Sequence, residues 1–182
     1  MRNKKYYILL ANVICLICGL FFSSLSFAVD VHKDRRLKMY NMNTKEYLDV
    51  TYWSRGQYDK RGYIKIARFL RDHRKNQAYP IDLRLINLLW VINDQATRGR
   101  GFIKIYSGFR SAETNAGLRK RGYHAARNSM HIKGKAIDFG IFGVTTEQLV
   151  RLAYALKAGG VGYYRGQGFI HIDTGNVRFW KY

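Results

Sequence analysis

Apolar and polar residues follow two regular patterns along most of the chain after residue 30. Alternation over residues 37–40 and 47–53, on either side of an Asn-Met-Asn-Thr turn, predicts a β-hairpin. Apolar residues three and four positions apart predict an amphipathic helix over about 63–75. The same spacing predicts a second helix over about 85–96, which follows the only proline, Pro80, and ends near Gly99. We interpret both helices as core elements.

The second half of the chain carries more strands than helices. Residues 102–106 favour a strand, Ser111 can cap a short helix that runs to about residue 119, and a basic loop follows to residue 128. A strand is expected over 136–142, and Thr145 with Gln148 forms a capping box for a helix that ends at a Gly-Gly pair, 159–160. Three short strands are expected over 161–164, 169–173 and 177–180. Helices followed by a closing antiparallel sheet indicate the α+β class.

Two of the expected strands contain polar residues within apolar runs. Because successive side chains of a strand point to opposite faces, Asp138 lies away from its apolar neighbours, and His171 and Asp173 share one face. Buried carboxylates are costly unless they are paired or coordinated. A His, a carboxylate and a second His form a ligand set that zinc accepts with one position left for water. His131, Asp138 and His171 therefore form a candidate metal site.

Spacing alone also allows these histidines to be ordinary core or surface residues. For His32 and His73 we keep that interpretation, and His124 belongs to the basic loop, where solvent exposure is the default. An aspartate within a strand can equally be an edge residue or a turn partner.

The first 28 residues have the composition of a secretory signal peptide. Basic residues at positions 2, 4 and 5 precede an apolar run over 6–22, and Ser26-Phe27-Ala28 supplies a cleavage site. An uncleaved membrane anchor is the alternative. Cys15 and Cys18 both lie in this segment, so residues 29–182 contain no cysteine and any metal there is held by His, Asp or Glu. We expect residues 29–182 to form one domain, with the metal site within about 105–182.

The chain is strongly basic, with a formal net charge of +20 that becomes +17 when the three basic residues of the signal segment are removed. Such a charge favours polyanionic partners. An exported protein meets the cell wall and anionic lipid rather than nucleic acid, so we expect peptidoglycan as the partner, no nucleic acid, and membrane contact only through an uncleaved signal segment. A monomer in the periplasm is expected.

Several motifs in one order resemble the MepK-type murein endopeptidases. These enzymes belong with the zinc D-alanyl-D-alanine carboxypeptidases and share the metal-binding fold of hedgehog and lysostaphin-type enzymes. The resemblance covers most of residues 29–182 and is densest from about 105. It rests on the runs Ser107-Gly108-Phe109-Arg110-Ser111 with Asn115, Ser129-x-His131-x-x-Gly134-x-Ala136-x-Asp138, Gly160-Val161-Gly162-Tyr163-Tyr164, and Phe169-Ile170-His171-Ile172-Asp173-Thr174-Gly175 with Arg178 and Trp180.

The resemblance implies a small antiparallel sheet that carries one Zn²⁺ ion, held by His131, Asp138 and His171. Arg110 matches an arginine that contacts substrate or stabilises developing negative charge. Many relatives carry a carboxylate base three residues before the last histidine, but Gly168 stands there in this chain. Asp173 is the nearest carboxylate, and we expect it to be the general base or to orient the catalytic water. In a competing assignment, Asp173 binds the metal and His171 is the acid/base helper.

The predicted function is that of an exported zinc metallopeptidase that hydrolyses amide bonds in peptidoglycan stem peptides or cross-links. We expect Arg110, Ser129, Tyr163 and Tyr164 to contact the substrate, although the tyrosines can equally pack the sheet. One alternative is a carboxypeptidase that trims a terminal D-amino acid. The other is a catalytically silent wall-binding module that keeps a structural zinc ion.

Overall fold

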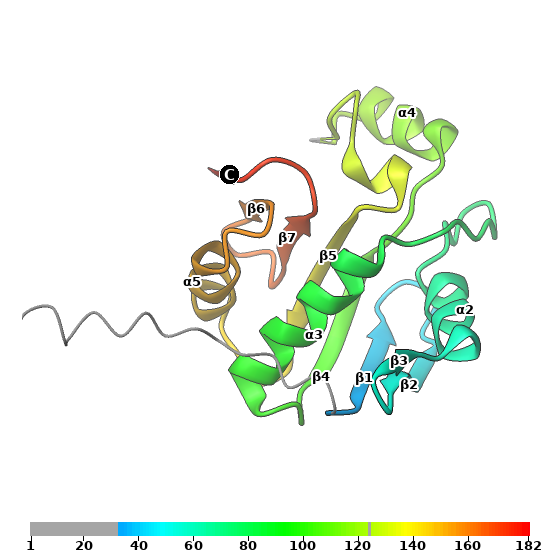
Figure 1. The fold of residues 1–182 in the computed structure, drawn as a ribbon. Helices are drawn as coiled ribbons and strands as arrows, with labels where there is room; N and C mark the ends of the chain where they lie inside the picture. Colours follow the sequence, from blue (N-terminus) through cyan, green and yellow to red (C-terminus); the bar gives the residue numbers. More distant parts are fainter. Residues whose placement is uncertain (1–32, 124) are drawn as a thin grey trace, which may run out of the picture. The chain divides into compact units, whose positions relative to one another are not determined.

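A computed structural model describes residues 33–123 and 125–182 of the chain (Figure 1). The predicted signal peptide, with Cys15 and Cys18, lies outside the described residues, as do His32 and His124. Within the described part of the chain, no helix is long and apolar enough to cross a membrane.

Among the described residues, eight strands form one mixed sheet in the order β3-β2-β1-β4-β5-β7-β6-β8. With the helices described below, this sheet confirms the predicted α+β class. The strands are β1 (Arg35–Asn41), β2 (Tyr47–Ser54), β3 (Gln57–Tyr58), β4 (Phe102–Ser107), β5 (Ala136–Ile141), β6 (Gly160–Tyr163), β7 (Ile170–Asp173) and β8 (Arg178–Lys181).

The sequence pattern predicted the first hairpin and an antiparallel sheet at the end of the chain, but not the order of the strands. β1 and β2 form the expected antiparallel hairpin, and β4, β5, β7 and β6 are antiparallel neighbours. Two further pairs, β1 with β4 and β6 with β8, are parallel, so the sheet is larger and more mixed than the small antiparallel sheet expected. Alternation identifies strands but does not identify their neighbours, which explains this difference.

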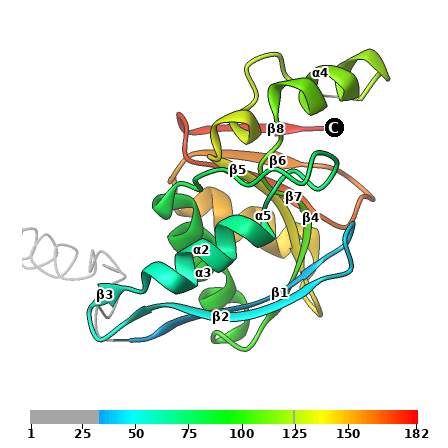
Figure 2. The same ribbon diagram turned by 90° about the vertical axis from the view of Figure 1, so that its right-hand side faces the viewer.

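Three helices pack on one face of the sheet and bury its apolar side chains. They are α2 (Lys60–Phe69), α3 (Leu83–Thr97) and α5 (Thr146–Ala155), and Figure 2 shows α4 (Ala112–Lys120) apart from them. Ile137, Phe139 and Ile141 of β5 point into the core that these helices cover. The intervening residues of β5 therefore face the other side of the sheet, where polar side chains are tolerated.

Helix α2 covers residues 60–69 rather than the predicted 63–75. The side chain of Asp59 accepts a hydrogen bond from the Arg61 amide and caps its start. After Leu70 the chain turns, and a short bridge joins Asp72 to Gln77. The apolar periodicity predicted a longer helix because Leu70, which directly follows the last residue of α2, is also buried. Helix α5 likewise ends earlier than predicted, at Ala155. Gly160, the second glycine of the predicted stop, is instead the first residue of β6.

Two helical glycines are expected to respond oppositely to alanine. A Cβ atom at Gly62 of α2 would lie 2.2 Å from the carbonyl oxygen of Thr51 on β2, whereas nothing lies within 4 Å of one at Gly117 of α4. Gly62→Ala should lower the free energy of unfolding by about 1–3 kcal/mol through overpacking. Gly117→Ala should raise it by about 0.5–1 kcal/mol, because alanine is the better helix former. Urea unfolding of both variants checks this pair, and a stabilising Gly62→Ala would contradict the packing of α2 on β2.

Candidate metal centre

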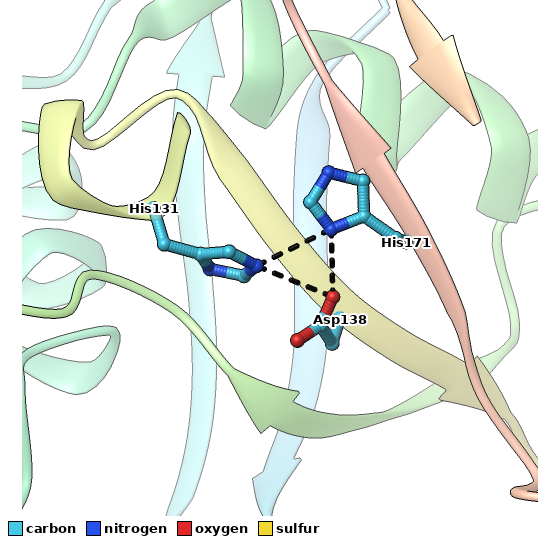
Figure 3. A group of neighbouring side chains, drawn as sticks. All are labelled: His131, Asp138 and His171. Carbon is cyan, nitrogen blue, oxygen red and sulfur yellow. Dashed lines mark hydrogen bonds and ion pairs between the residues drawn. The ribbon is translucent and has the colours of Figure 1, made fainter. Parts of the chain in front are cut away.

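Three side chains from separate elements converge on the sheet face opposite the helices. Asp138 lies on β5, His171 on β7, and His131 on a short 3-10 helix, η1 (Met130–Lys133), that precedes β5 (Figure 3). One donor atom from each lies within 4.8 Å of the others. His171 Nδ1 lies 2.8 Å and His131 Nε2 lies 3.3 Å from Asp138 Oδ1, and the two nitrogens are 3.2 Å apart.

Local structure explains why these three side chains meet. Asp138 and His171 are direct partners in the β5–β7 pairing, so their side chains leave the sheet side by side. The Ser129 side chain caps η1 by accepting from the His131 amide, and Gly134 ends it with a φ of 63°. A Cβ atom at Gly134 would lie 2.1 Å from the carbonyl oxygen of Pro80. This position therefore requires glycine, and the turn fixes where His131 points.

The outer nitrogen of each histidine has a hydrogen-bond acceptor. His131 Nδ1 lies 2.7 Å from the carbonyl oxygen of Gly108, and His171 Nε2 lies 3.0 Å from Asp173 Oδ2. Each outer nitrogen therefore carries a proton and donates it, which leaves the inner nitrogens with their lone pairs toward Asp138. Three electron-pair donors that face one another at such distances need a shared cation or proton. The donor set thus fits a metal ion.

The electrostatics of the cluster agree with a cation at its centre. Burial alone would raise the pKa of Asp138, but the charges and hydrogen bonds of His131 and His171 hold it well below its usual range. Burial lowers the pKa of His131. At His171 burial acts in the same direction, yet hydrogen bonds to Asp138 and Asp173 raise its pKa overall. A metal ion bound here would displace any proton that the two imidazoles share with Asp138.

Asp173 contacts the outer nitrogen of His171 and not the three converging donor atoms. Its side chain is fully buried, and its two oxygens accept hydrogen bonds from His171, Arg178 and the amides of Gly160 and Gly175. These contacts lie behind His171, on the side away from Asp138. We therefore revise the expected role of Asp173, because its oxygens are occupied and its closest contact in the cluster is the outer nitrogen of His171.

Gly168 has space for a side chain but not a favourable backbone conformation for one. A Cβ atom there would meet only the Tyr106 hydroxyl, at 3.5 Å, but the Gly168 φ of 71° is in the left-handed region, where side chains are strained. A carboxylate residue at this position would therefore strain the backbone before β7.

A buried aspartate that the sequence did not indicate holds Ser111, the residue next to Arg110. Asp72 is buried, and its Oδ2 atom accepts hydrogen bonds from the backbone amide and from the hydroxyl of Ser111. The Ser111 side chain also caps the start of α4. The amide of Arg110 donates to the carbonyl oxygen of His131 at 3.3 Å. The Nε atom of the Arg110 side chain is buried and has no hydrogen-bond partner within residues 33–123 and 125–182. Asp72 and Ser111 are 39 positions apart in the sequence, which explains why no local pattern links them.

Replacing Asp72 by asparagine is expected to destabilise the fold in a pH-dependent way. Burial alone would raise the pKa of Asp72, but hydrogen bonds from Thr114, Ser111 and the Arg74 amide lower it overall. The carboxylate therefore stabilises the fold above its unfolded pKa of about 4, and this contribution is lost as the pH falls through the lower native pKa. At pH 7 the variant should lose about 1–3 kcal/mol. Urea unfolding at pH 7 and pH 3 should show a smaller difference at pH 3, and an equal difference would contradict this role.

Two cavities that share part of their walls adjoin the metal cluster. His131, His171 and Ser129 line one of about 460 Å³, and Asp138 lines the other, of about 510 Å³. Arg110 and Tyr164 line both. Burial and the negative charge of Asp138 raise the pKa of Tyr164, so its hydroxyl is protonated at neutral pH. Among the described residues that line the two cavities, Asp138 has the only acidic side chain.

Tyr163 lies on the other face of the sheet. Its hydroxyl donates to Glu147 of α5, and it lines neither cavity. Strand alternation already separates it from Tyr164, since adjacent residues point to opposite faces. We therefore leave Tyr163 out of the substrate site. Trp180 instead lines the first cavity, with its ring centroid 5.1 Å from that of His171. Of the lone histidines, only His73 lies in the described part of the chain, where it is half-buried and outside the cluster.

An α+β fold with a His-Asp-His cluster on an open face of its sheet defines the class of metal-dependent hydrolases. The family described as peptidoglycan L,D-endopeptidase MepK matches residues 29–180. The chain is 37% identical over 180 residues to the probable peptidoglycan L,D-endopeptidase MepK of Haemophilus influenzae. The aligned region covers 99% of this chain and 96% of that protein. It is 38% identical over 154 residues to peptidoglycan L,D-endopeptidase MepK of Escherichia coli K12 and of Shigella flexneri, with 81% of each chain covered. The chain therefore belongs to the MepK family of peptidases. No solved structure matches it significantly.

Proposed function

We propose that this chain is an exported, zinc-dependent murein endopeptidase that hydrolyses L,D amide bonds in peptidoglycan. The convergence of two imidazole nitrogens and a carboxylate oxygen beside two cavities carries the proposal. Membership of the MepK family supports the substrate class and the bond type. His131, Asp138 and His171 are the proposed metal ligands.

Zinc is the ion that we propose for this site, with one ion bound. Two histidines and one carboxylate are a common ligand set of catalytic zinc, which keeps one position open. When bound, zinc supplies Lewis acidity and lowers the pKa of a coordinated water toward neutrality. The hydrogen bonds from His131 to Gly108 and from His171 to Asp173 orient the two imidazoles for this role.

Arg110 and Tyr164 are the proposed substrate contacts at the reacting amide. Both line the two cavities that adjoin the cluster. The guanidinium group of Arg110 and the protonated hydroxyl of Tyr164 each provide a donor beside the site. Such preorganised donors stabilise the negative charge that develops on the carbonyl oxygen during hydrolysis. Ser129 is proposed to shape the opposite wall of the first cavity.

Asp173 is proposed as a positioning residue that acts through His171. Its hydrogen bond to His171 Nε2 fixes the ring orientation and raises the basicity of the inner nitrogen. Arg178 and two backbone amides hold the carboxylate in place. These contacts favour His171 as the ligand over the competing assignment in which Asp173 binds the metal.

Space in two cavities beside the cluster favours an endopeptidase over a carboxypeptidase. A carboxypeptidase needs room for one terminal residue, whereas an endopeptidase must accommodate peptide on both sides of the scissile bond. Cavities of about 460 and 510 Å³ adjoin the cluster, and they share Arg110 and Tyr164. The predicted signal peptide and the basic composition support export to the periplasm and contact with the anionic wall.

Cleavage of defined cross-linked muropeptides tests this proposal. Purified protein spanning residues 29–182, loaded with zinc, should split an L,D-cross-linked dimer into monomers of the masses expected for hydrolysis at the cross-link. A D,D-cross-linked dimer of the same composition should be cleaved at least about tenfold more slowly. Release of only a terminal amino acid would indicate a carboxypeptidase, and binding without cleavage would indicate a silent module. Either result would overturn the proposal.

A further inference from the structure

The cavity of about 510 Å³, lined in part by Asp138, has an unusual charge balance. Arg74, Arg110 and Arg165 all line it, and Asp138 is the one acidic side chain among its described lining residues. We call it the Arg74–Arg165 pocket. Asp138 faces the two histidines, so a metal ion would neutralise its charge. Three guanidinium groups then remain around one pocket that has no other acidic side chain among its described lining residues.

The three arginines are not held in place by ion pairs. Within residues 33–123 and 125–182, no salt bridge joins Arg74, Arg110 or Arg165 to a carboxylate. Other arginines of the chain do pair, as Arg36 does with Asp49 and Arg178 with Asp173. Like charges that line one pocket repel one another, and an anion bound in the pocket would lower this repulsion.

The fixed position of Arg74 argues against a chance grouping. Its backbone amide donates to Oδ1 of Asp72, while Oδ2 of the same carboxylate holds Ser111, the neighbour of Arg110. One buried aspartate therefore fixes the backbone that carries two of the three arginines. Arg165 approaches from the turn after β6, and Gln167 adds an amide to the same wall.

We propose that the Arg74–Arg165 pocket binds a free carboxylate of the peptidoglycan peptide on one side of the scissile bond. The inference rests on the proposed function, since it names a subsite for that substrate. Planar guanidinium groups bind carboxylates through paired hydrogen bonds, which gives direction as well as affinity. The pocket adjoins the metal cluster through Arg110, Asp138 and Tyr164. A carboxylate held there would set which amide bond lies at the metal.

Binding of an un-cross-linked stem peptide tests the proposal without requiring cleavage. The zinc-loaded wild-type protein is titrated calorimetrically with the peptide and with forms in which each free carboxylate is converted in turn to a carboxamide. One amidation should weaken binding by about 10- to 100-fold, the value of a charged hydrogen-bonded pair. The double variant R74Q/R165Q should bind the free and amidated peptides equally weakly. Arg74 and Arg165 are exposed, so both changes should leave the fold intact, as circular dichroism can verify.

The matched control is R151Q, which removes an exposed arginine from α5 on the other face of the sheet. It should bind both peptides as the wild type does. Wild-type discrimination between free and amidated peptides in R74Q/R165Q would overturn the proposal. So would inorganic phosphate that binds the wild-type protein as tightly as the peptide, because the pocket would then be a general anion site. Discrimination without cleavage of any cross-linked dimer would refute the proposed function and leave this subsite supported.

Discussion

Asp138→Ala is expected to remove the bound metal and peptidoglycan cleavage together. Asp138 is the one carboxylate in the cluster, and its loss leaves two neutral imidazoles as ligands. Zinc content should fall from about one ion per chain to near zero, because a carboxylate contributes both a ligand and the compensating charge. Since the metal supplies several kcal/mol of transition-state stabilisation, kcat/KM should fall by at least about a thousandfold. Elemental analysis and muropeptide release measure the two effects on the same sample.

A matched aspartate provides the control for this substitution. Asp94 pairs with Lys33 on the surface, and Asp94→Ala should keep both zinc and activity, because an exposed ion pair contributes little. Asp138→Asn keeps the shape of the side chain if the alanine variant folds poorly. A folded Asp138→Asn protein that retains full activity at near-zero zinc content would contradict the assigned role of the carboxylate.

Asp173→Asn is expected to weaken zinc binding about 10- to 100-fold, as the loss of a hydrogen-bond partner to a ligating histidine does in other metal sites. The Asp173 carboxylate accepts hydrogen bonds from His171 Nε2 and from Arg178. The uncharged side-chain amide of asparagine is a weaker acceptor for both. Activity should recover substantially when zinc is raised to saturate the weakened site. Competition with a chelating dye gives the affinity, and kinetics at saturating zinc give the recovery.

The same variant separates a positioning residue from a general base. If Asp173 took the proton from water, zinc affinity would be close to that of the wild type and kcat would be low at every zinc concentration. Asp49→Asn is the control, because it removes one carboxylate of another Asp–Arg pair far along the sheet. It should leave zinc affinity and kcat unchanged.

The metal cluster could be predicted from the sequence because two of its members obey strand alternation. Asp138 and His171 are polar positions inside short apolar strands, and the period of two places each on the face opposite the core. Periodicity could not place His131, which lies on a 3-10 helix and was a candidate as the histidine that completes a zinc ligand set. The direct pairing of Asp138 with His171 depends on register, which alternation does not specify.

The surroundings of the cluster could not be predicted, because they depend on contacts between distant segments. The backbone carbonyl oxygen of Gly108 accepts a hydrogen bond from His131. Every residue type has a backbone carbonyl, so the sequence cannot indicate this contact. Asp72 lies just past the end of α2, where the periodicity wrongly predicted more helix. The occupied oxygens of Asp173 follow from Arg178 and from two amides brought close by β6 and β8.

Digestion of intact sacculi by the purified protein, with and without a chelator, tests the central claim most directly. The wild-type protein should release muropeptides whose masses correspond to hydrolysis of L,D amide bonds. Chelation should stop this release, and zinc added in slight excess should restore it. Undiminished release by a folded protein that elemental analysis shows to be free of metal would contradict a metal-dependent murein endopeptidase.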